Sequence, residues 1–251
     1  MISLHPLKGR CGAVCAVALA ICCTMSSAVQ AAIIPAPANS TVLNPGQSVK
    51  LDQLTLNNIS GIVVGDKLFS NFLYSWSNDM PAPSNVNVVA LSSGGNVGIR
   101  FQGSFVDLPG GSDSDAGISF TVSVLDTEQK IKGANLASAI FLDPNTAGSF
   151  GSVDESFLGN SPTITDLLHA FNSTLGPGGS QFEDSVTFAN QYSVLHVQKN
   201  INANAAALAV QPVRMTIIDQ LFPQTDIPEP TTVGLLLGCM AVMGTQRRSW
   251  L

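Results

Sequence analysis

Three aspartates surround a glycine-rich loop in the middle of the chain, and their chemistry suits a hard cation. Asp107, Asp113 and Asp115 flank the segment Pro109–Ser112. Calcium takes several oxygen ligands, which carboxylates, serine hydroxyls and free carbonyls supply. The spacing does not match an EF-hand loop, because the required glycine and terminal glutamate are missing. Two interpretations stay open, a calcium site and a solvated acidic turn.

A second candidate site is aromatic. Tyr74 and Trp76 are two residues apart, so on a strand they share one face, and Phe72 joins them if the strand is regular. Exposed, such rings form a platform on which sugars stack, as in carbohydrate-binding β-sandwiches. Buried, they belong to the core, which is the commoner outcome. We therefore treat Tyr74 and Trp76 as candidate ligand-binding residues with a structural alternative.

Catalytic patterns are missing from the sequence. The adjacent carboxylates Asp154–Glu155 and Glu183–Asp184 point to opposite faces of a strand, so neither supplies the pair that flanks a sugar in glycoside hydrolysis. His169 and His196 have no partner that spacing identifies. Neither a serine-hydrolase elbow nor a phosphate-binding loop is present. We predict no catalytic residues and a protein that is not an enzyme.

Cysteine positions narrow the chemistry further. All five cysteines lie near the chain ends, at Cys11, Cys15, Cys22, Cys23 and Cys239. The region 32–226 therefore contains none. This excludes a disulfide framework, a cysteine-ligated zinc or iron–sulfur site and a thiol nucleophile in that region. No cofactor is predicted other than the calcium considered above.

Charge argues against nucleic acid as a partner. The chain has 11 Lys and Arg and 17 Asp and Glu, which gives a net charge of −6. The region 32–226 is more acidic, with seven basic and sixteen acidic residues and a net charge of −9. Binding to phosphates requires clustered Lys and Arg instead.

The elements that must position these residues are mainly strands. Apolar and polar residues alternate over Ile118–Val124 and Val97–Phe101, and a similar alternation runs from Val49 to Leu56. The segment 166–171 is either a short helical turn or a strand. Turns rich in Gly, Pro, Asn and Ser separate these runs. The pattern predicts an all-β fold, a single antiparallel β-sandwich over residues 32–222 that resembles a jelly roll.

The N-terminus has the pattern of a secretory signal peptide over residues 1–31. Lys8 and Arg10 precede the apolar run Cys11–Cys23, and Val29–Ala31 supplies small residues for cleavage. The run is too short to span a bilayer. Lipoprotein processing at Cys22 is the alternative, although a bulky isoleucine precedes that cysteine where a small residue is expected.

The C-terminus combines a proline-rich linker with an apolar segment. Residues 223–230 form the linker and contain Pro228, Glu229 and Pro230, whose prolines prevent regular structure. Residues 231–251 carry an apolar run and end in a basic tail. We expect a short transmembrane helix whose arginines stay on the cytoplasmic side. The alternative is a core helix with a basic tail.

This tail resembles the PEP-CTERM sorting signal of bacterial exported proteins. The matching residues are Pro228, Glu229 and Pro230, the apolar segment after them, and Arg247 with Arg248. The resemblance implies recognition by exosortase, a membrane protease-transpeptidase, and delivery to the envelope or extracellular matrix, often alongside exopolysaccharide. Whether the tail is then removed stays open. The same tail is also labelled an ice-binding protein C-terminal domain.

Together these patterns predict an exported, non-enzymatic envelope or extracellular-matrix protein, either structural or associated with exopolysaccharide. A carbohydrate-binding module that uses Tyr74 and Trp76 is the first alternative. A carbohydrate-active hydrolase that uses Glu155 or Glu183 is the second. Ice binding ranks last, because the sequence shows no regular threonine-rich face.

Overall fold

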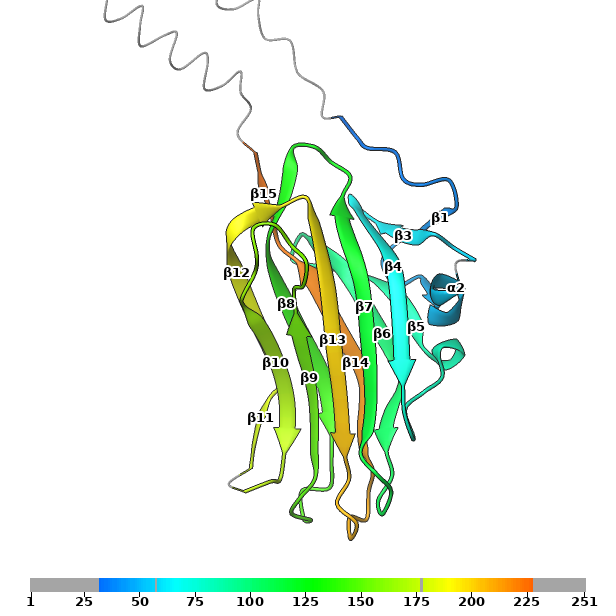
Figure 1. Ribbon diagram of the computed structural model, residues 1–251, viewed down its shortest axis with the longest axis vertical. Coiled ribbons are helices and arrows are strands. Elements are labelled where there is room, and N and C mark those ends of the chain that lie inside the picture. The colour runs from blue at the N-terminus through cyan, green and yellow to red at the C-terminus, as the bar shows by residue number, and fades with distance from the viewer. Residues whose placement is uncertain (1–31, 57, 177, 228–251) are drawn as a thin grey trace, which may run out of the picture. The chain divides into compact units, whose positions relative to one another are not determined.

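Two β-sheets make up the computed structural model, which describes residues 32–227 apart from residues 57 and 177 (Figure 1). The eight-stranded sheet has the order β1 (Ser40–Val42), β3 (Gly61–Val64), β4 (Lys67–Trp76), β7 (Ser114–Val124), β13 (Val194–Asn204), β9 (Phe150–Ser156), β10 (Leu167–Ser173) and β11 (Gly179–Gln181). The seven-stranded sheet has the order β12 (Glu183–Tyr192), β8 (Gln129–Phe141), β14 (Val213–Phe222), β6 (Asn96–Asp107), β5 (Asn87–Ser93) and β2 (Ser48–Lys50), with β15 (Gln224–Asp226) paired to β8.

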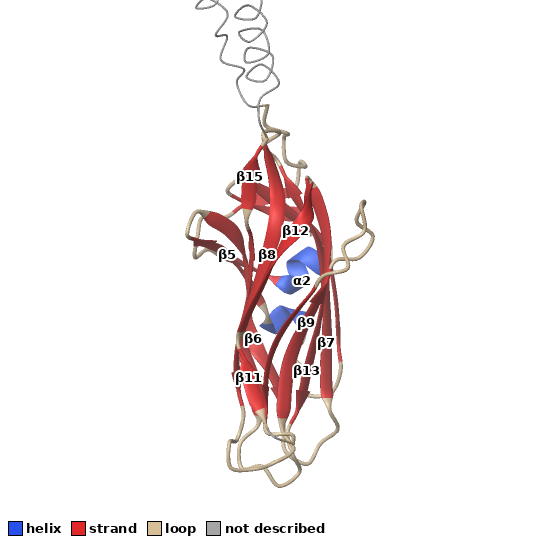
Figure 2. Ribbon diagram, turned by 90° about the vertical axis from the view of Figure 1, so that its left-hand side faces the viewer, coloured by secondary structure: helices blue, strands red, loops and turns tan. Residues whose placement is uncertain are grey.

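The two sheets pack face to face as separate layers, which Figure 2 shows from the side. Paired strands are antiparallel except for the parallel pair of β1 and β3. The chain changes sheet at each step from β6 to β9 and again from β11 to β14. Such repeated crossing is typical of a jelly roll. The structure therefore confirms the predicted all-β sandwich.

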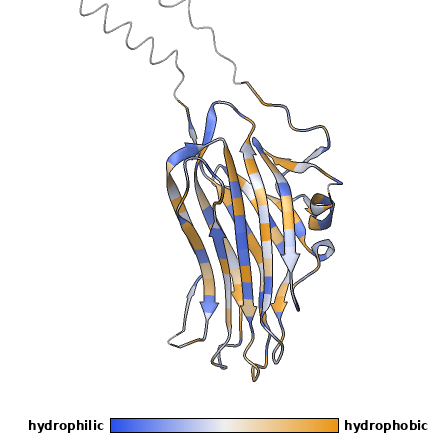
Figure 3. Ribbon diagram, in the orientation of Figure 1, coloured by the Kyte–Doolittle hydropathy of each residue, from blue (hydrophilic) through white to orange (hydrophobic). Residues whose placement is uncertain are grey.

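Alternation along the strands decides which residues form the core. In β7, Ile118, Phe120, Val122 and Val124 are buried, whereas Ser119 and Ser123 between them are less so. Figure 3 shows the resulting alternation of hydrophobic and hydrophilic segments along the strands. Side chains on a strand point alternately to opposite faces, so this pattern places one set between the sheets. The other set faces outward and supplies the candidate sites.

Phenylalanine rings from both sheets meet in the middle of the core. Phe69, Phe72 and Phe120 come from the eight-stranded sheet, and Phe101 and Phe222 come from the seven-stranded sheet. Their centroids lie 5.6–6.5 Å apart where they contact one another. Each buried ring contributes about 1.5–3 kcal/mol relative to exposure. This cluster fixes the spacing of the two layers.

A bulge in β4 sets the direction of the aromatic residues that follow it. The register with β7 shifts between Ser70 and Leu73, and Asn71 has a φ of 55°. Because of this extra residue, Phe69 and Phe72 both point inward although they are three apart. The side chains after Phe72 then alternate regularly again.

Two short segments fold differently from, or more definitely than, the sequence pattern predicts. The alternating stretch predicted from Val49 to Leu56 is a strand only as far as Lys50, and Leu51–Thr55 forms the short helix α2. The reason is that Leu51 and Leu54 are both buried, and a spacing of three places them on one face of a helix. Of the segment 166–171, which the sequence left open, residues 167–171 belong to strand β10. A 3₁₀ turn, η1 (Pro83–Asn85), precedes β5.

The second sheet extends beyond the boundary expected at residue 222. Gln224–Asp226 pairs with Gln129–Ile131 of β8, so the first residues assigned to the linker are part of the sheet. Within residues 32–227, no helix is long and apolar enough to cross a membrane. The predicted signal peptide, the sorting motif Pro228–Pro230 and the C-terminal arginines lie outside the described residues.

Candidate functional site

A groove lies on the outer face of the seven-stranded sheet. It has a volume of about 750 Å³ and is lined by residues of β5, β6, β8, β12 and β14. The residues on its floor alternate with buried core residues, as Arg100 does between Ile99 and Phe101. The floor side chains therefore point away from the core. A hollow of this size accommodates a small molecule or a short segment of a polymer.

An ion pair crosses the groove floor between β6 and β14. Arg100 and Asp219 stand directly opposite each other in the paired strands. The Arg100 guanidinium donates from Nε to Oδ1 at 2.5 Å and from Nη2 to Oδ2 at 2.7 Å. This hydrogen bond, together with the negative charge of Asp219, raises the pKa of Arg100 against the effect of partial burial. Two hydrogen bonds therefore hold the guanidinium against the carboxylate.

The two hydrogen bonds from Arg100 to Asp219 do not use all the N–H donors of the guanidinium. Arginine has five N–H donors, of which this pair occupies one on Nε and one on Nη2. The side chains of Arg100 and Asp219 are 33% and 20% exposed, so both are accessible from the groove. A hydroxyl-rich ligand can thus receive hydrogen bonds from Arg100 and donate to Asp219 at neighbouring positions.

Polar and aliphatic side chains complete the lining. Asn135 of β8 and Ser185 of β12 are directly opposite each other, and Glu183 lies two residues before Ser185. Leu91 and Leu221 add apolar surface. The groove therefore combines amide, hydroxyl and carboxylate groups with aliphatic patches.

Asp184 also lines the groove, but its carboxylate is engaged in the fold. Its Oδ2 accepts a hydrogen bond from the backbone N–H of His169 in β10 at 2.9 Å, and its Oδ1 accepts from the N–H of Ser185 at 2.8 Å. The first bond joins β12 of one sheet to β10 of the other. Asp184 therefore links the two sheets through a hydrogen bond between β12 and β10.

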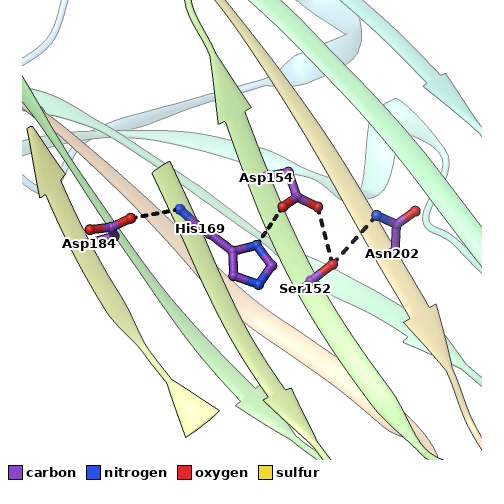
Figure 4. A network of polar contacts seen from close by, with 5 residues as sticks. All are labelled: Ser152, Asp154, His169, Asp184 and Asn202. Carbon is purple, nitrogen blue, oxygen red and sulfur yellow. Dashed lines mark hydrogen bonds and ion pairs between the residues drawn. The ribbon is translucent and has the colours of Figure 1, made fainter. Parts of the chain in front are cut away.

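A second polar cluster lies on the outer face of the eight-stranded sheet (Figure 4). The ring Nδ1 of His169 lies 2.5 Å from Oδ1 of Asp154, and these side chains are 46% and 49% exposed. The Ser152 hydroxyl donates to Oδ2 of Asp154 at 3.4 Å, and Asn202 donates to Ser152 at 3.5 Å. His169 also stacks on Phe171 with centroids 4.9 Å apart. Two hollows of about 350 and 450 Å³ border this cluster.

This cluster does not have the geometry of a serine-hydrolase triad. In that triad the serine hydroxyl bonds to the histidine, and the aspartate bonds to the other ring nitrogen. Here the Asp154 carboxylate lies between Ser152 and His169 and bonds to both. Among the described residues no hydrogen bond joins Ser152 to His169. The network therefore orders the imidazole without activating the serine.

The predicted aromatic residues stand at the end of β4. Tyr74 and Trp76 share one face and stack with centroids 5.5 Å apart and an interplanar angle of 12°. Tyr74 is half-buried, and its hydroxyl donates to the carbonyl of Pro81 at 2.7 Å. Burial raises the pKa of Tyr74. Trp76 is 49% exposed. The pair is thus anchored on one ring and accessible on the other, and it lies on the opposite sheet from the groove.

The three aspartates of the predicted calcium loop are not brought together. Asp107 is buried, with Oδ1 accepting from the Ser114 hydroxyl and Oδ2 from the N–H of Ala205, both at 2.6 Å. Asp113 accepts a hydrogen bond from Asn204, and Asp115 is exposed. Within residues 32–227, no group of three or more His, Cys, Asp or Glu side chains is arranged to hold a metal ion. Protein donors therefore satisfy Asp107 where calcium was considered.

The adjacent carboxylates separate as the sequence predicts. Asp154 faces outward beside His169, whereas Glu155 is buried between the sheets next to Lys199. Glu155 is therefore out of reach of a polysaccharide, which removes it as a candidate hydrolase residue. Glu183 lies in the groove.

The sequence patterns did not predict the two polar pairs found on the outer faces of the sheets. Arg100 and Asp219 are 119 residues apart, and His169 and Asp154 are 15 apart on neighbouring strands. The alternation shows that each points outward, but only the strand order brings them together.

No family model matches the chain. A search of curated proteins also gives no match. Among solved structures, the carbohydrate-binding module TmCBM27, described for its specific mannan recognition, is similar with 14% identity and a TM-score of 0.27, covering 71% of this chain and 96% of that one. An arabinose-bound α-L-arabinofuranosidase, MgGH51, has 9% identity and a TM-score of 0.24, covering 60% of this chain and 23% of that one. Likenesses this distant carry no functional assignment.

Proposed function

We propose that this chain is an exported, non-catalytic β-sandwich protein that binds a neutral polysaccharide in the groove on the outer face of the seven-stranded sheet. The observation that carries the proposal is the Arg100–Asp219 pair on the floor of a hollow of about 750 Å³. The exported location rests on the signal-like N-terminus and the sorting-like tail.

The groove chemistry matches what a sugar offers. Neighbouring hydroxyls of a sugar ring both donate and accept hydrogen bonds, and the fixed pair of Arg100 and Asp219 presents donors and an acceptor side by side. Asn135 and Ser185 extend this polar surface along the groove. The C–H faces of the sugar meet aliphatic groups such as Leu91 and Leu221.

The balance of charge in the groove favours a neutral glycan. Asp219 neutralises Arg100, and Glu183 adds a further carboxylate to the lining. The region 32–226 has a net charge of −9. A polymer of uronic acids would meet repulsion from both sources. A neutral polysaccharide would not.

A glycan array tests the proposed ligand class. The full-length chain is applied to neutral and uronate-containing polysaccharides, and calorimetry follows on the strongest binder. Arg100→Lys keeps the positive charge but loses the two-pronged geometry, so affinity should fall about tenfold. Arg214→Lys is the matched control, because Arg214 lies over the Phe141 ring on the same sheet and outside the groove lining. Equal binding by wild type and Arg100→Lys would contradict the proposal.

Hydrolysis is the alternative outcome that the groove itself raises. Glu183 and Asp219 both line it, and two carboxylates are the usual equipment of glycoside hydrolases. Asp219 is committed to Arg100, which favours binding over proton transfer. Release of new reducing ends by the wild type, lost in Glu183→Gln, would replace the binding proposal with a hydrolase.

The sorting tail supports an exosortase-type protease as a partner, with the membrane engaged through residues 231–251 before processing. Fractionation of cells that express the intact chain and a chain ending at residue 227 tests this part. The intact chain should reach the envelope or medium, and the truncated chain should lose retention at the membrane. Cytoplasmic location of both would contradict export.

A further inference from the structure

Three polar side chains meet inside the sandwich, far from both outer faces. Glu155 of β9 and Lys199 of β13 are directly opposite each other in paired strands of the eight-stranded sheet. Gln220 of β14 reaches them from the seven-stranded sheet. The exposed fraction is 1% for Glu155 and 0% for Lys199 and Gln220. Lys199 Nζ contacts both Oε2 of Glu155 and Oε1 of Gln220.

Burial favours the neutral forms of the acid and the amine. It raises the pKa of Glu155 and lowers the pKa of Lys199, and in each case the charge of the other residue opposes the change. Asp184 near Glu155 raises the pKa of that glutamate, and Asp219 raises the pKa of Lys199. A desolvated, neutral lysine amine is a nucleophile, and a neutral carboxylic acid can donate a proton.

Hydrogen bonding leaves this trio incomplete. Among the described residues, Oε1 of Glu155 and Nε2 of Gln220 are buried without a hydrogen-bond partner. A buried polar group without a partner costs free energy, typically about 1–3 kcal/mol. The noncovalent trio therefore joins its three side chains through Lys199 Nζ and leaves one polar atom of Glu155 and one of Gln220 unsatisfied.

We propose that Lys199 and Gln220 become joined by an intramolecular amide bond that forms inside the folded sandwich, with Glu155 as the proton-transfer residue. The lone pair of Lys199 Nζ attacks Cδ of Gln220, one bond beyond the oxygen that Nζ contacts. The new Nζ–Cδ bond forms and the Cδ–Nε2 bond breaks. The protonated Glu155 delivers its proton to Nε2, which leaves as ammonia, and the resulting carboxylate takes a proton from Nζ. No oxidant, reductant or other reactant is consumed.

The amide between Lys199 and Gln220 removes the unsatisfied hydrogen bonding of the noncovalent trio. Nε2 of Gln220, buried without a partner, departs. The new amide N–H lies beside Glu155, whose carboxyl group can accept its hydrogen bond. The bond ties β13 to β14 across the two sheets and closes a loop between residues 21 apart. In a region without cysteine, it gives a covalent cross-link that disulfides cannot supply.

Peptide mass spectrometry of the full-length protein tests the bond directly. Trypsin cleaves after a free lysine but not after an acylated one. The expected product is peptide 133–214, uncleaved after Lys199 and joined to the peptide that begins at Met215, with a mass lower by about 17 Da for the lost ammonia. Separate, unmodified peptides 133–199 and 200–214 would overturn the proposal. An amide between Lys199 and Glu155 would overturn it too. That product is peptide 133–214 alone, uncleaved after Lys199, not joined to the peptide that begins at Met215, and lighter by one water.

Controls separate the chemistry from effects on folding. Lys67 is a second buried lysine, but its Nζ contacts the Asp66 carboxylate. Normal cleavage after Lys67 in the same digest shows that a lysine buried in the folded protein is still cleaved by trypsin once the protein is unfolded. Missing cleavage after Lys199 is then due to its modification. Glu155→Gln should slow formation of the linked peptide roughly 100-fold or more, because it removes the proton-transfer residue. Circular dichroism checks that this variant keeps its strands. Unchanged linkage in a folded Glu155→Gln would overturn the role of Glu155.

Discussion

Asp219 and Gln220 are neighbours on β14, yet they enter opposite environments. Asp219 points into the groove, where Arg100 holds it in a two-pronged ion pair with partial exposure to solvent. Gln220 points between the sheets, where it contacts Lys199 beside Glu155 and no solvent reaches it. Outside, the pairing keeps both charges available to a ligand. Inside, burial shifts the pKa values of Glu155 and Lys199 toward neutral forms. The direction of a side chain therefore decides whether it faces solvent in the groove or meets buried polar partners between the sheets.

Substitution in the buried trio of Glu155, Lys199 and Gln220 should have the largest effect on stability. Lys199→Ala removes one partner of a buried pair and leaves Glu155 without its partner, so the free energy of unfolding should fall by about 3–5 kcal/mol. Urea unfolding of the full-length chain measures the change. Lys50→Ala is the matched control, because Lys50 is exposed and its loss should cost no more than about 0.5 kcal/mol. A loss below about 1 kcal/mol for Lys199→Ala would show that the buried trio adds little to stability.

Substitution of the Arg100–Asp219 pair in the groove should reduce polysaccharide affinity more than stability. Arg100→Ala removes a charged hydrogen-bond donor from the groove floor, so affinity for the neutral polysaccharide should fall by about 10–100-fold. The free energy of unfolding should change by no more than about 1 kcal/mol, because the pair is partly exposed. Calorimetry and urea unfolding of the same preparations check both values. Loss of stability without loss of affinity would assign the pair a structural role.

A carboxylate held by hydrogen bonds should behave oppositely to Glu155 as pH changes. Asp143 accepts from the N–H groups of Val210 and Asn145 and from the Thr146 hydroxyl, and these bonds lower its pKa. Its stabilising effect is therefore present above the ordinary aspartate pKa and is lost as pH falls through the lower folded-state value. Below about pH 4, the melting temperature of the wild type should fall more steeply than that of Asp143→Asn.

Asp115→Asn serves as the control for that titration. Asp115 is exposed, and its carboxylate makes no hydrogen bond among the described residues. Its melting curve should follow the wild type at every pH. Parallel curves for the wild type and Asp143→Asn would remove Asp143 as a source of acid sensitivity.

The smallest effect should come from the aromatic pair on the opposite sheet. Trp76→Ala loses its stacking on Tyr74, so the free energy of unfolding should fall by about 1 kcal/mol or less. Polysaccharide affinity should stay unchanged if the groove is the binding site. Calorimetry with Trp76→Ala and Arg100→Ala side by side decides between the two sites. Lost affinity in Trp76→Ala alone would assign binding to the aromatic platform.

The sequence predicts the architecture better than the site. Alternation over Ile118–Val124 identifies part of β7, since one buried face imposes a period of two. The helix at Leu51–Thr55 escapes the same reasoning, because five residues fit either period. The directions of Asp154 and Glu155 also follow from alternation alone. Which outward residues meet does not, because it depends on strand order.

The contact between Arg100 and Asp219 illustrates that limit. β6 and β14 are neighbours only because the chain has crossed between the sheets several times before β14 begins. The buried trio depends in the same way on β9, β13 and β14 coming together. A lysine and a glutamate in a strand pattern are normally assigned to the solvent face, so their burial has no local signal. Long-range pairing carries the information that single-strand patterns lack.

The hydrogen bond from the His169 N–H to Asp184 also bears on how copies of this protein meet. β10 pairs with β11 only from Phe171 to Ser173, so the part of β10 around His169 lies at a sheet edge. Free N–H groups on such an edge attract strands of other chains and start aggregation. Asp184 occupies this donor with a negative charge that repels an approaching carbonyl. Asp184 therefore protects this edge against strand-to-strand assembly with other copies of the chain.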